Sequence, residues 1–166
     1  MATALLITRD DIVRFTQMNG NLDTDTFIQY IKISQDIEIQ EMLGTDLLKK
    51  IQADIVASNL VDPYLSLLND YIKDCLIHFA YARYLPNGAY TISNKGIYKH
   101  NSENSDTVSK EEIDYLEGKA MQTAMHYKER FVQYMNFNQS NFPEYTSNSD
   151  GDVFPSDDVN FTGWVM

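Results

Sequence analysis

The chain has 166 residues, of which 43% are hydrophobic and 12% are aromatic, and its net charge at pH 7 is −11. This length favours one domain with a sizeable core, and the apolar content excludes a chain that is disordered throughout. The excess of acidic residues argues against a protein that grips nucleic acid, and the single cysteine excludes an internal disulfide.

Two helices are expected in the first quarter of the chain. The first begins after Thr8, which can cap it, and Asp10 and Asp11 fall in its first turn, where the helix dipole favours anions. The second runs from Asp25 to Leu43, and its apolar residues drift around the helix instead of keeping to one stripe. Such a drift is typical of a helix that packs on two neighbours.

A third helix is expected from Asp46 to about Ser58, with Gly44 as the C-terminal cap of the helix before it and Thr45 as its own N-terminal cap. The fourth helix, from Pro63 to Leu85, is the longest strongly apolar stretch of the chain. Almost every side of it is apolar from Cys75 onward, which predicts that other helices or other subunits enclose it.

The stretch after the fourth helix predicts a β-hairpin at about residues 90–99. Tyr90 and Ile92 precede a polar turn segment, Ile97 and Tyr98 follow it, and a glycine at the turn supplies the positive φ that such turns require. A lone hairpin is marginally stable in water. We therefore expect it either to pack on the helices or to pair with strands of neighbouring copies.

The last helix is expected to begin with a capping box, in which Glu112 lies three residues after Ser109. Apolar residues then recur at intervals of three and four from Ile113 to Tyr134, enough for about seven turns. Leu116 is part of this stripe.

From Asn138 onward the composition changes, because residues 138–166 have five acidic residues and no Lys or Arg. Five aromatic residues are interspersed through this segment: Phe142, Tyr145, Phe154, Phe161 and Trp164. A purely solvating tail rarely holds so many aromatics, so we interpret the segment as an extended arm that orders on a partner, with a flexible tail as the alternative. The predicted fold is mainly α: a bundle of about five helices in residues 1–137, with the inserted β-hairpin, followed by the extended arm.

No set of residues in the sequence predicts a catalytic, cofactor-binding or metal site. The glycines form neither a phosphate-binding loop nor a dinucleotide fingerprint. His78, His100 and His126 lie far apart and outside any short metal-ligand motif, and Cys75 is expected to be a buried, inert thiol. We therefore expect a protein that is not an enzyme and that has no cofactor.

Three stretches of the chain share an overall pattern with one known family. They are ITRDDIVRFTQMNGNLDTDTFIQYIKISQDIEIQEMLGTDLLKKI (7–51), FAYARYLPNGAYTISNKGIYKHNSENSDTVS (79–109) and YLEGKAMQTAMHYKERFVQYM (115–135). Over about residues 7–137 the chain resembles the head–tail adaptor (connector) proteins of tailed bacteriophages, in particular those of crAss-like and other Bacteroidetes phages. The most specific features are IQEMLGTDLLKKI (39–51) and YTISNKGIYKHNSENSD (90–106).

The resemblance implies a structural virion protein, made in the bacterial host cytoplasm, whose copies form a ring of twelve beneath the portal vertex. Such a ring binds the portal protein, extends the DNA channel for genome ejection and gives the next tail component its docking surface. DNA passes through the channel without specific binding, and no membrane takes part. Adaptors of this family embrace the portal with a C-terminal segment, which implies that role for the last helix and the arm.

Two sets of residues are therefore candidates for contacts. The subunit interface is expected to include Tyr90, Ile92, Ile97, Tyr98 and Lys99. The arm that binds the portal or another partner is expected to be anchored by Phe142, Tyr145, Phe154, Phe161 and Trp164, because aromatics are the commonest anchors of interfaces. The alternative function is an acidic helical regulator or inhibitor that binds a cellular protein through its C-terminal tail.

Overall fold

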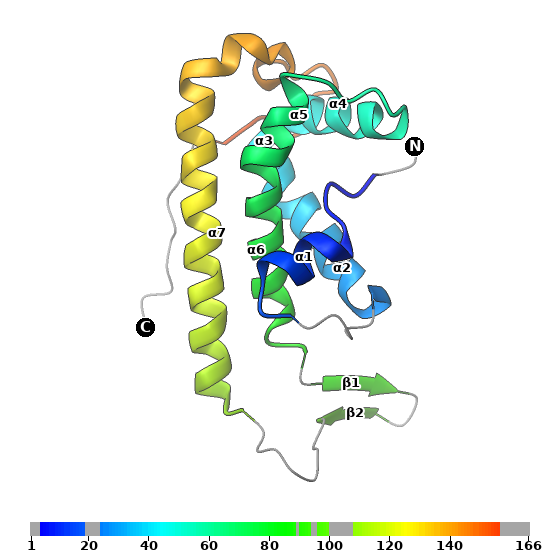
Figure 1. The fold of residues 1–166 in the computed structure, drawn as a ribbon, viewed down its shortest axis with the longest axis vertical. Helices are drawn as coiled ribbons and strands as arrows, with labels where there is room; N and C mark the ends of the chain where they lie inside the picture. The colour runs from blue at the N-terminus through cyan, green and yellow to red at the C-terminus, as the bar shows by residue number, and fades with distance from the viewer. Residues whose placement is uncertain (1–3, 19–23, 89, 94–95, 100–107, 157–166) are drawn as a thin grey trace.

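The computed structural model describes residues 4–18, 24–88, 90–93, 96–99 and 108–156 (Figure 1). Its elements follow in the order α1 (Arg9–Phe15), α2 (Thr24–Ser34), η1 (Gln35–Ile39), α3 (Gln40–Leu43), α4 (Thr45–Val56), α5 (Tyr64–Leu67), η2 (Leu68–Ile72), α6 (Lys73–Tyr84), β1 (Tyr90–Ser93), β2 (Gly96–Lys99), α7 (Lys110–Asn138), η3 (Gln139–Asn141) and η4 (Pro143–Thr146). The prediction of a mainly helical bundle is confirmed.

The first helix, α1, starts at the predicted cap and has a complete capping box. The Thr8 hydroxyl accepts a hydrogen bond from the backbone N–H of Asp11, and the Asp11 carboxylate accepts one from the backbone N–H of Thr8 at 2.8 Å. The chain before α1 is held by the buried Gln35, which accepts from the N–H of Leu6 at 2.9 Å and donates to the carbonyl of Ala4 at 3.0 Å. These bonds fix the N-terminal segment on the second helix.

The predicted second helix is continuous through α2, η1 and α3, and η1 is a π-helical turn. A π turn inserts one extra residue, so the apolar face rotates where it occurs. This rotation accounts for the drift of the apolar residues that the sequence shows between Asp25 and Leu43. The helix ends at Gly44, whose φ of 77° lies in the region that favours glycine.

Thr45 is not the cap that the sequence predicts for the next helix. The N-cap position of α4 is Gly44, and Thr45 is the first helical residue. The Thr45 hydroxyl instead donates to the Asp152 carboxylate at 3.0 Å and accepts from the backbone N–H of Val153 at 3.1 Å. The prediction fails because the hydroxyl bonds to the C-terminal segment and not to its own helix.

Helix α6 is the centre of the bundle, with α7 on one side and α2 on the other (Figure 1). Its buried residues are Cys75, Leu76, Ile77, Phe79, Ala80 and Ala82. Because helices of the same chain cover these residues, the apolar helix needs no second subunit around it. Of the two kinds of cover that the sequence left open, the structure shows neighbouring helices.

Helix α7 packs along α6 but extends past it at the end where the hairpin lies (Figure 1). It begins with the predicted capping box, in which the Ser109 N–H donates to the Glu112 carboxylate at 2.8 Å. Ala120 and Ala124 are the first buried residues along α7, and no residue before Ala120 is buried. The first turns of the helix therefore stand outside the core.

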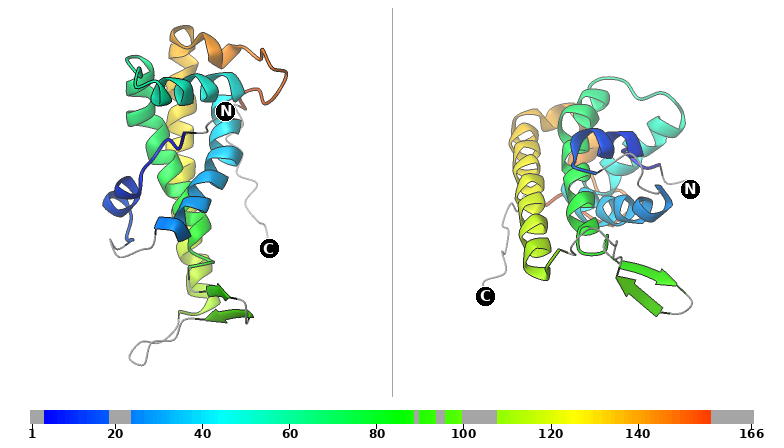
Figure 2. Two further views of the ribbon diagram at one scale, coloured as in Figure 1. Left: turned by 90° about the vertical axis from the view of Figure 1, so that its right-hand side faces the viewer. Right: turned by 60° about the horizontal axis from the view of Figure 1, so that its bottom comes forward.

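The strands β1 and β2 pair antiparallel, with Tyr90 opposite Lys99 and Ile92 opposite Ile97. They form a two-stranded sheet among the residues that the structure describes. Figure 1 and the right view of Figure 2 show this hairpin at one end of the molecule, displaced from the start of α7. Each strand therefore has one edge that no other described strand pairs with.

The described part of the predicted arm folds back onto the helices and is not extended. Residues 139–146 form the short helices η3 and η4, and the chain then crosses the corner between α3 and α4 (Figure 2). The carbonyl of Val153 accepts from Thr45 N–H at 2.9 Å, and the N–H of Ser156 donates to the carbonyl of Glu41 at 2.9 Å. The segment up to Ser156 is thus part of the helical body.

Candidate functional site

The predicted subunit-interface residues lie in the hairpin. Their backbone positions are in β1 and β2, and their side chains lie outside the part of the chain that the structure describes: Tyr90, Ile92, Ile97, Tyr98 and Lys99. Successive residues of a strand lie on alternate faces, and residues directly opposite one another share a face. The register therefore assigns Tyr90, Ile92, Ile97 and Lys99 to one face of the hairpin, and Thr91 and Tyr98 to the other.

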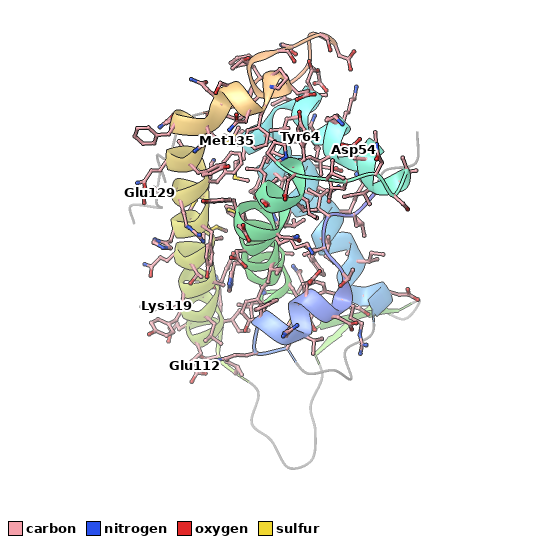
Figure 3. All side chains as sticks on the ribbon, turned by 45° about the horizontal axis from the view of Figure 1, so that its top comes forward. Asp54, Tyr64, Glu112, Lys119, Glu129 and Met135 are labelled. Atoms are coloured by element: carbon pink, nitrogen blue, oxygen red, sulfur yellow. The ribbon has the colours of Figure 1, made fainter. Side chains whose placement is uncertain are left out.

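The start of α7 is a second surface at the same end of the molecule. Three apolar residues are exposed to solvent there, with exposed fractions of 48% for Val108, 64% for Tyr115 and 41% for Leu116. Together with Ser109, Glu111 and Glu112 they line an open groove of about 740 Å³. Figure 3 shows Glu112 and Lys119 at this end of α7, far from Tyr64 and Met135 at the packed end.

The sequence does not single out this groove, because Leu116 belongs to the same periodic stripe as the buried residues of α7. The sequence signal for the groove is that the apolar stripe of α7 begins before the part of the helix that is buried. The stripe begins at Ile113, about two turns before Ala120, the first residue of α7 that is fully buried. Apolar residues that continue a buried stripe past the end of the partner helix are available to another surface.

Two of the five predicted partner-binding aromatics are in the core of this chain. Phe142 is 0% exposed and Tyr145 is 6% exposed. The Phe142 ring meets the Tyr64 ring edge to face at 5.4 Å between centroids, and the Tyr145 ring meets Phe131 in the same way at 6.2 Å. The prediction that Phe142 and Tyr145 anchor a partner is wrong, because both side chains are already buried against this chain's own helices.

A hydrogen bond between α5 and η4 strengthens this aromatic contact. The Tyr64 hydroxyl donates to the Glu144 carboxylate at 2.6 Å. Partial burial, with the adjoining carboxylate as the next cause, raises the pKa of Tyr64 to about 12. Tyr64 therefore remains a neutral donor over the whole physiological range of pH.

Polar contacts then hold residues 147–153 on the start of α4. The Asp46 carboxylate accepts from the Ser147 hydroxyl at 2.7 Å, and from both the N–H and the hydroxyl of Ser149 at 2.9 Å. These bonds lower the pKa of Asp46 below its ordinary value. An ion pair between Lys49 and Asp150 lies beside them. We call Asp46, Ser147 and Ser149 the serine clamp.

The remaining predicted anchors lie further along the chain. Phe154 is 56% exposed, although it is flanked by Val153 and Pro155, which contact α4 and Gly44. Phe161 and Trp164 lie outside the described residues. Their prediction as partner anchors stays a prediction.

Titratable residues of the core do not gather into a reactive group. His78 stacks on Tyr127 at 5.4 Å between ring centroids, and burial lowers its pKa. Burial also raises the pKa of the Cys75 thiol, which is fully buried, as expected of an inert cysteine. In the ranges that the structure describes, no three His, Cys, Asp or Glu side chains are placed to hold a metal ion together. None of the helices described has both the length and the apolar character needed to cross a membrane.

Comparison with known proteins places the chain in a family but not in a functional class. Residues 39–155 match the model of a family described as Family of unknown function (DUF6712). The match begins in η1 and ends at Pro155, so it includes the hairpin, the start of α7 and the serine clamp. No curated protein and no solved structure matches the chain.

Proposed function

The chain belongs to the family of unknown function DUF6712, and we propose that it is a structural head–tail adaptor of a tailed bacteriophage. In this proposal its copies form a ring, twelve by resemblance, that binds the portal protein on one side and the next tail component on the other. The ring extends the DNA channel and performs no chemistry. The resemblance over about residues 7–137 is one support for this role.

The observation that supports it most is that strand edges and neighbouring apolar residues are exposed together at the end of the molecule that holds the hairpin and the start of α7. Two strand edges of the hairpin are left open there, together with three neighbouring apolar residues at the start of α7 that line one groove. Exposed apolar residues also occur elsewhere on the described helices, for example Phe15, Ile37 and Phe137. Unpaired strand edges and exposed apolar residues are surfaces that proteins usually cover. Neighbouring copies in a ring would cover both.

The charge of the chain suits a channel through which DNA slides. With 24 Asp and Glu against 13 Lys and Arg, the protein repels phosphate more than it attracts it. A channel that neutralised many phosphates would hold DNA instead of releasing it. In this proposal DNA therefore passes without specific binding.

Electron microscopy of the full chain mixed with the portal protein of the same phage tests the proposal. We expect an additional ring of density stacked on the portal and coaxial with its channel. Portal particles that are unchanged by a molar excess of the chain would contradict the proposal.

A second candidate function rests on the C-terminal segment. The serine clamp and the Ser156–Glu41 bond fix the chain just before its last ten residues, which include Phe161 and Trp164. A monomeric regulator would present these residues to a cellular protein. Such a regulator would form a one-to-one complex with that protein and would leave the portal unchanged.

A further inference from the structure

The groove at the start of α7 has the composition of a docking site. It combines the exposed apolar side chains of Val108, Tyr115 and Leu116 with the carboxylates of Glu111 and Glu112. Asp114 and Glu117 add further negative charge to the same turns, so residues 110–119 hold four acidic residues against two lysines. An occupant of this groove would need an apolar face edged by positive charge.

The chain's own hairpin has that composition. The register puts Tyr90, Ile92, Ile97 and Lys99 on one face. Residues 85–102 carry two lysines and neither Asp nor Glu, although the chain as a whole has a net charge of −11. This long acid-free stretch is thus complementary to the acidic groove both in charge and in apolar character.

The hairpin does not reach the groove of its own chain. The two lie apart at the same end of the molecule, and the hairpin points away from α7 in Figure 1 and in the right view of Figure 2. Among the described residues, the extensive contacts of β1 and β2 are with each other. The groove and the complementary hairpin face are therefore both available to another copy.

We propose that the hairpin of one copy docks, through the face that holds Tyr90, Ile92, Ile97 and Lys99, into the α7 groove of a second copy. This contact specifies how neighbouring copies of the proposed ring bind each other, and it rests on the proposed homo-oligomeric function. The donor and acceptor surfaces are different, so the contact is head-to-tail and can repeat from copy to copy until a ring closes. The proposal pairs Tyr115 and Leu116 with the isoleucines of that hairpin face, and Glu111 with Lys99.

Cysteine pairs placed in separate copies test the docking directly. Full-length Ile97→Cys is mixed with full-length Leu116→Cys, with portal protein present, and the mixture is oxidised. We expect a disulfide-linked dimer in at least about tenfold higher yield than in two control mixtures. One control pairs Thr91→Cys, on the other hairpin face, with Leu116→Cys, and the other pairs Ile97→Cys with Glu129→Cys, an exposed position further along α7. Cys75 is buried and stays in every variant.

Equal yields in all three mixtures would overturn the docking. So would a disulfide that forms within single chains of the Ile97→Cys, Leu116→Cys double variant while the mixture of single variants gives none. In that case the hairpin would occupy the groove of its own copy.

Charge reversal gives a second test that does not depend on oxidation. Lys99→Glu and Glu111→Lys are each expected to lower the yield of rings assembled on the portal about tenfold. The variant that combines both changes is expected to recover most of this yield. Glu111 is chosen because Glu112 closes the capping box of α7. Losses that simply add in the combined variant would contradict the pairing.

The adaptor function and the docking of the hairpin can be contradicted separately. A ring on the portal without the 97–116 disulfide would contradict the docking and support the adaptor function. A 97–116 disulfide found only in a closed dimer, in which two copies exchange hairpins, would support the docking and contradict the ring.

Discussion

Gly44 is where the C-terminal segment comes closest to the helices. Its φ is +77°, and a Cβ at this position would lie 2.6 Å from Cδ of Pro155. Both the backbone conformation and the contact therefore require glycine.

Gly44→Ala is expected to destabilise the fold by about 1–3 kcal/mol, because alanine is strained at positive φ and displaces Pro155. Urea unfolding followed by circular dichroism measures the loss. The matched control is Gly118→Ala in α7, where a Cβ would meet nothing within 4 Å. That variant is expected to gain about 0.5–1 kcal/mol, because alanine favours a helix interior. Equal effects at the two sites would contradict the close contact at Gly44.

The serine clamp makes stability depend on pH in a defined direction. Hydrogen bonds from Ser147 and Ser149 lower the pKa of Asp46 below its ordinary value of 3.8. A carboxyl whose pKa is lowered by folding stabilises the fold above its ordinary pKa, and this stabilisation disappears as the pH falls through the lowered value. Asp46→Asn should therefore unfold at a lower urea concentration than wild type at pH 7, and the difference should shrink below about pH 4.

Glu129→Gln, which changes an exposed carboxylate of α7, is the control for this experiment. It is expected to follow wild type across the same pH range. If Asp46→Asn also follows wild type at pH 7, the clamp does not hold the C-terminal segment.

At the scale of elements, residues 138–156 are part of the fold. Phe142 is fully buried against Tyr64 and Tyr134, whereas Phe154 is 56% exposed. Phe142→Ala is expected to cost about 3–5 kcal/mol, because it leaves a cavity in the core. Phe154→Ala is expected to change stability by less than about 0.5 kcal/mol. Similar unfolding free energies for the two variants would show that the segment does not pack as described.

Truncation separates the packed part of the segment from the residues beyond it. A chain ending at Phe137 loses the Phe142 and Tyr145 contacts and is expected to melt at a markedly lower temperature than wild type. A chain ending at Ser156 keeps these contacts and the serine clamp, so it is expected to melt with wild type. Only the truncation after Ser156 tests whether Phe161 and Trp164 bind a partner, because this variant keeps its fold and a loss of assembly is then not caused by unfolding.

Most of the helices were predictable because their signals are local. Thr8 and Ser109 close capping boxes within one turn, and Gly44 ends a helix through its own backbone. The role of Thr45 was not predictable, since it depends on residues that are distant in sequence. Thr45 bonds with Asp152 and Val153.

At the scale of the whole molecule, the placement of apolar surface decides what is free to bind. The apolar sides of α6 predicted cover by other helices or by other subunits, and α2 and α7 of the same chain provide it. The aromatics of the C-terminal segment suggested an extended arm that orders on a partner, but Phe142 and Tyr145 are in the core. Composition shows how much apolar surface a chain has, and only the tertiary structure shows which part remains uncovered. Here the uncovered part includes the start of α7, a surface that the sequence did not identify.

The central claim is that neighbouring copies of the same chain, in a ring on the portal, cover the hairpin and the start of α7. The mass of the complex between the full chain and the portal protein, measured by native mass spectrometry, tests it most directly. The proposed function predicts one ring of many copies for each portal, with twelve expected from the resemblance. A complex with a single copy for each partner molecule, or portal that gains no mass at all, would contradict it.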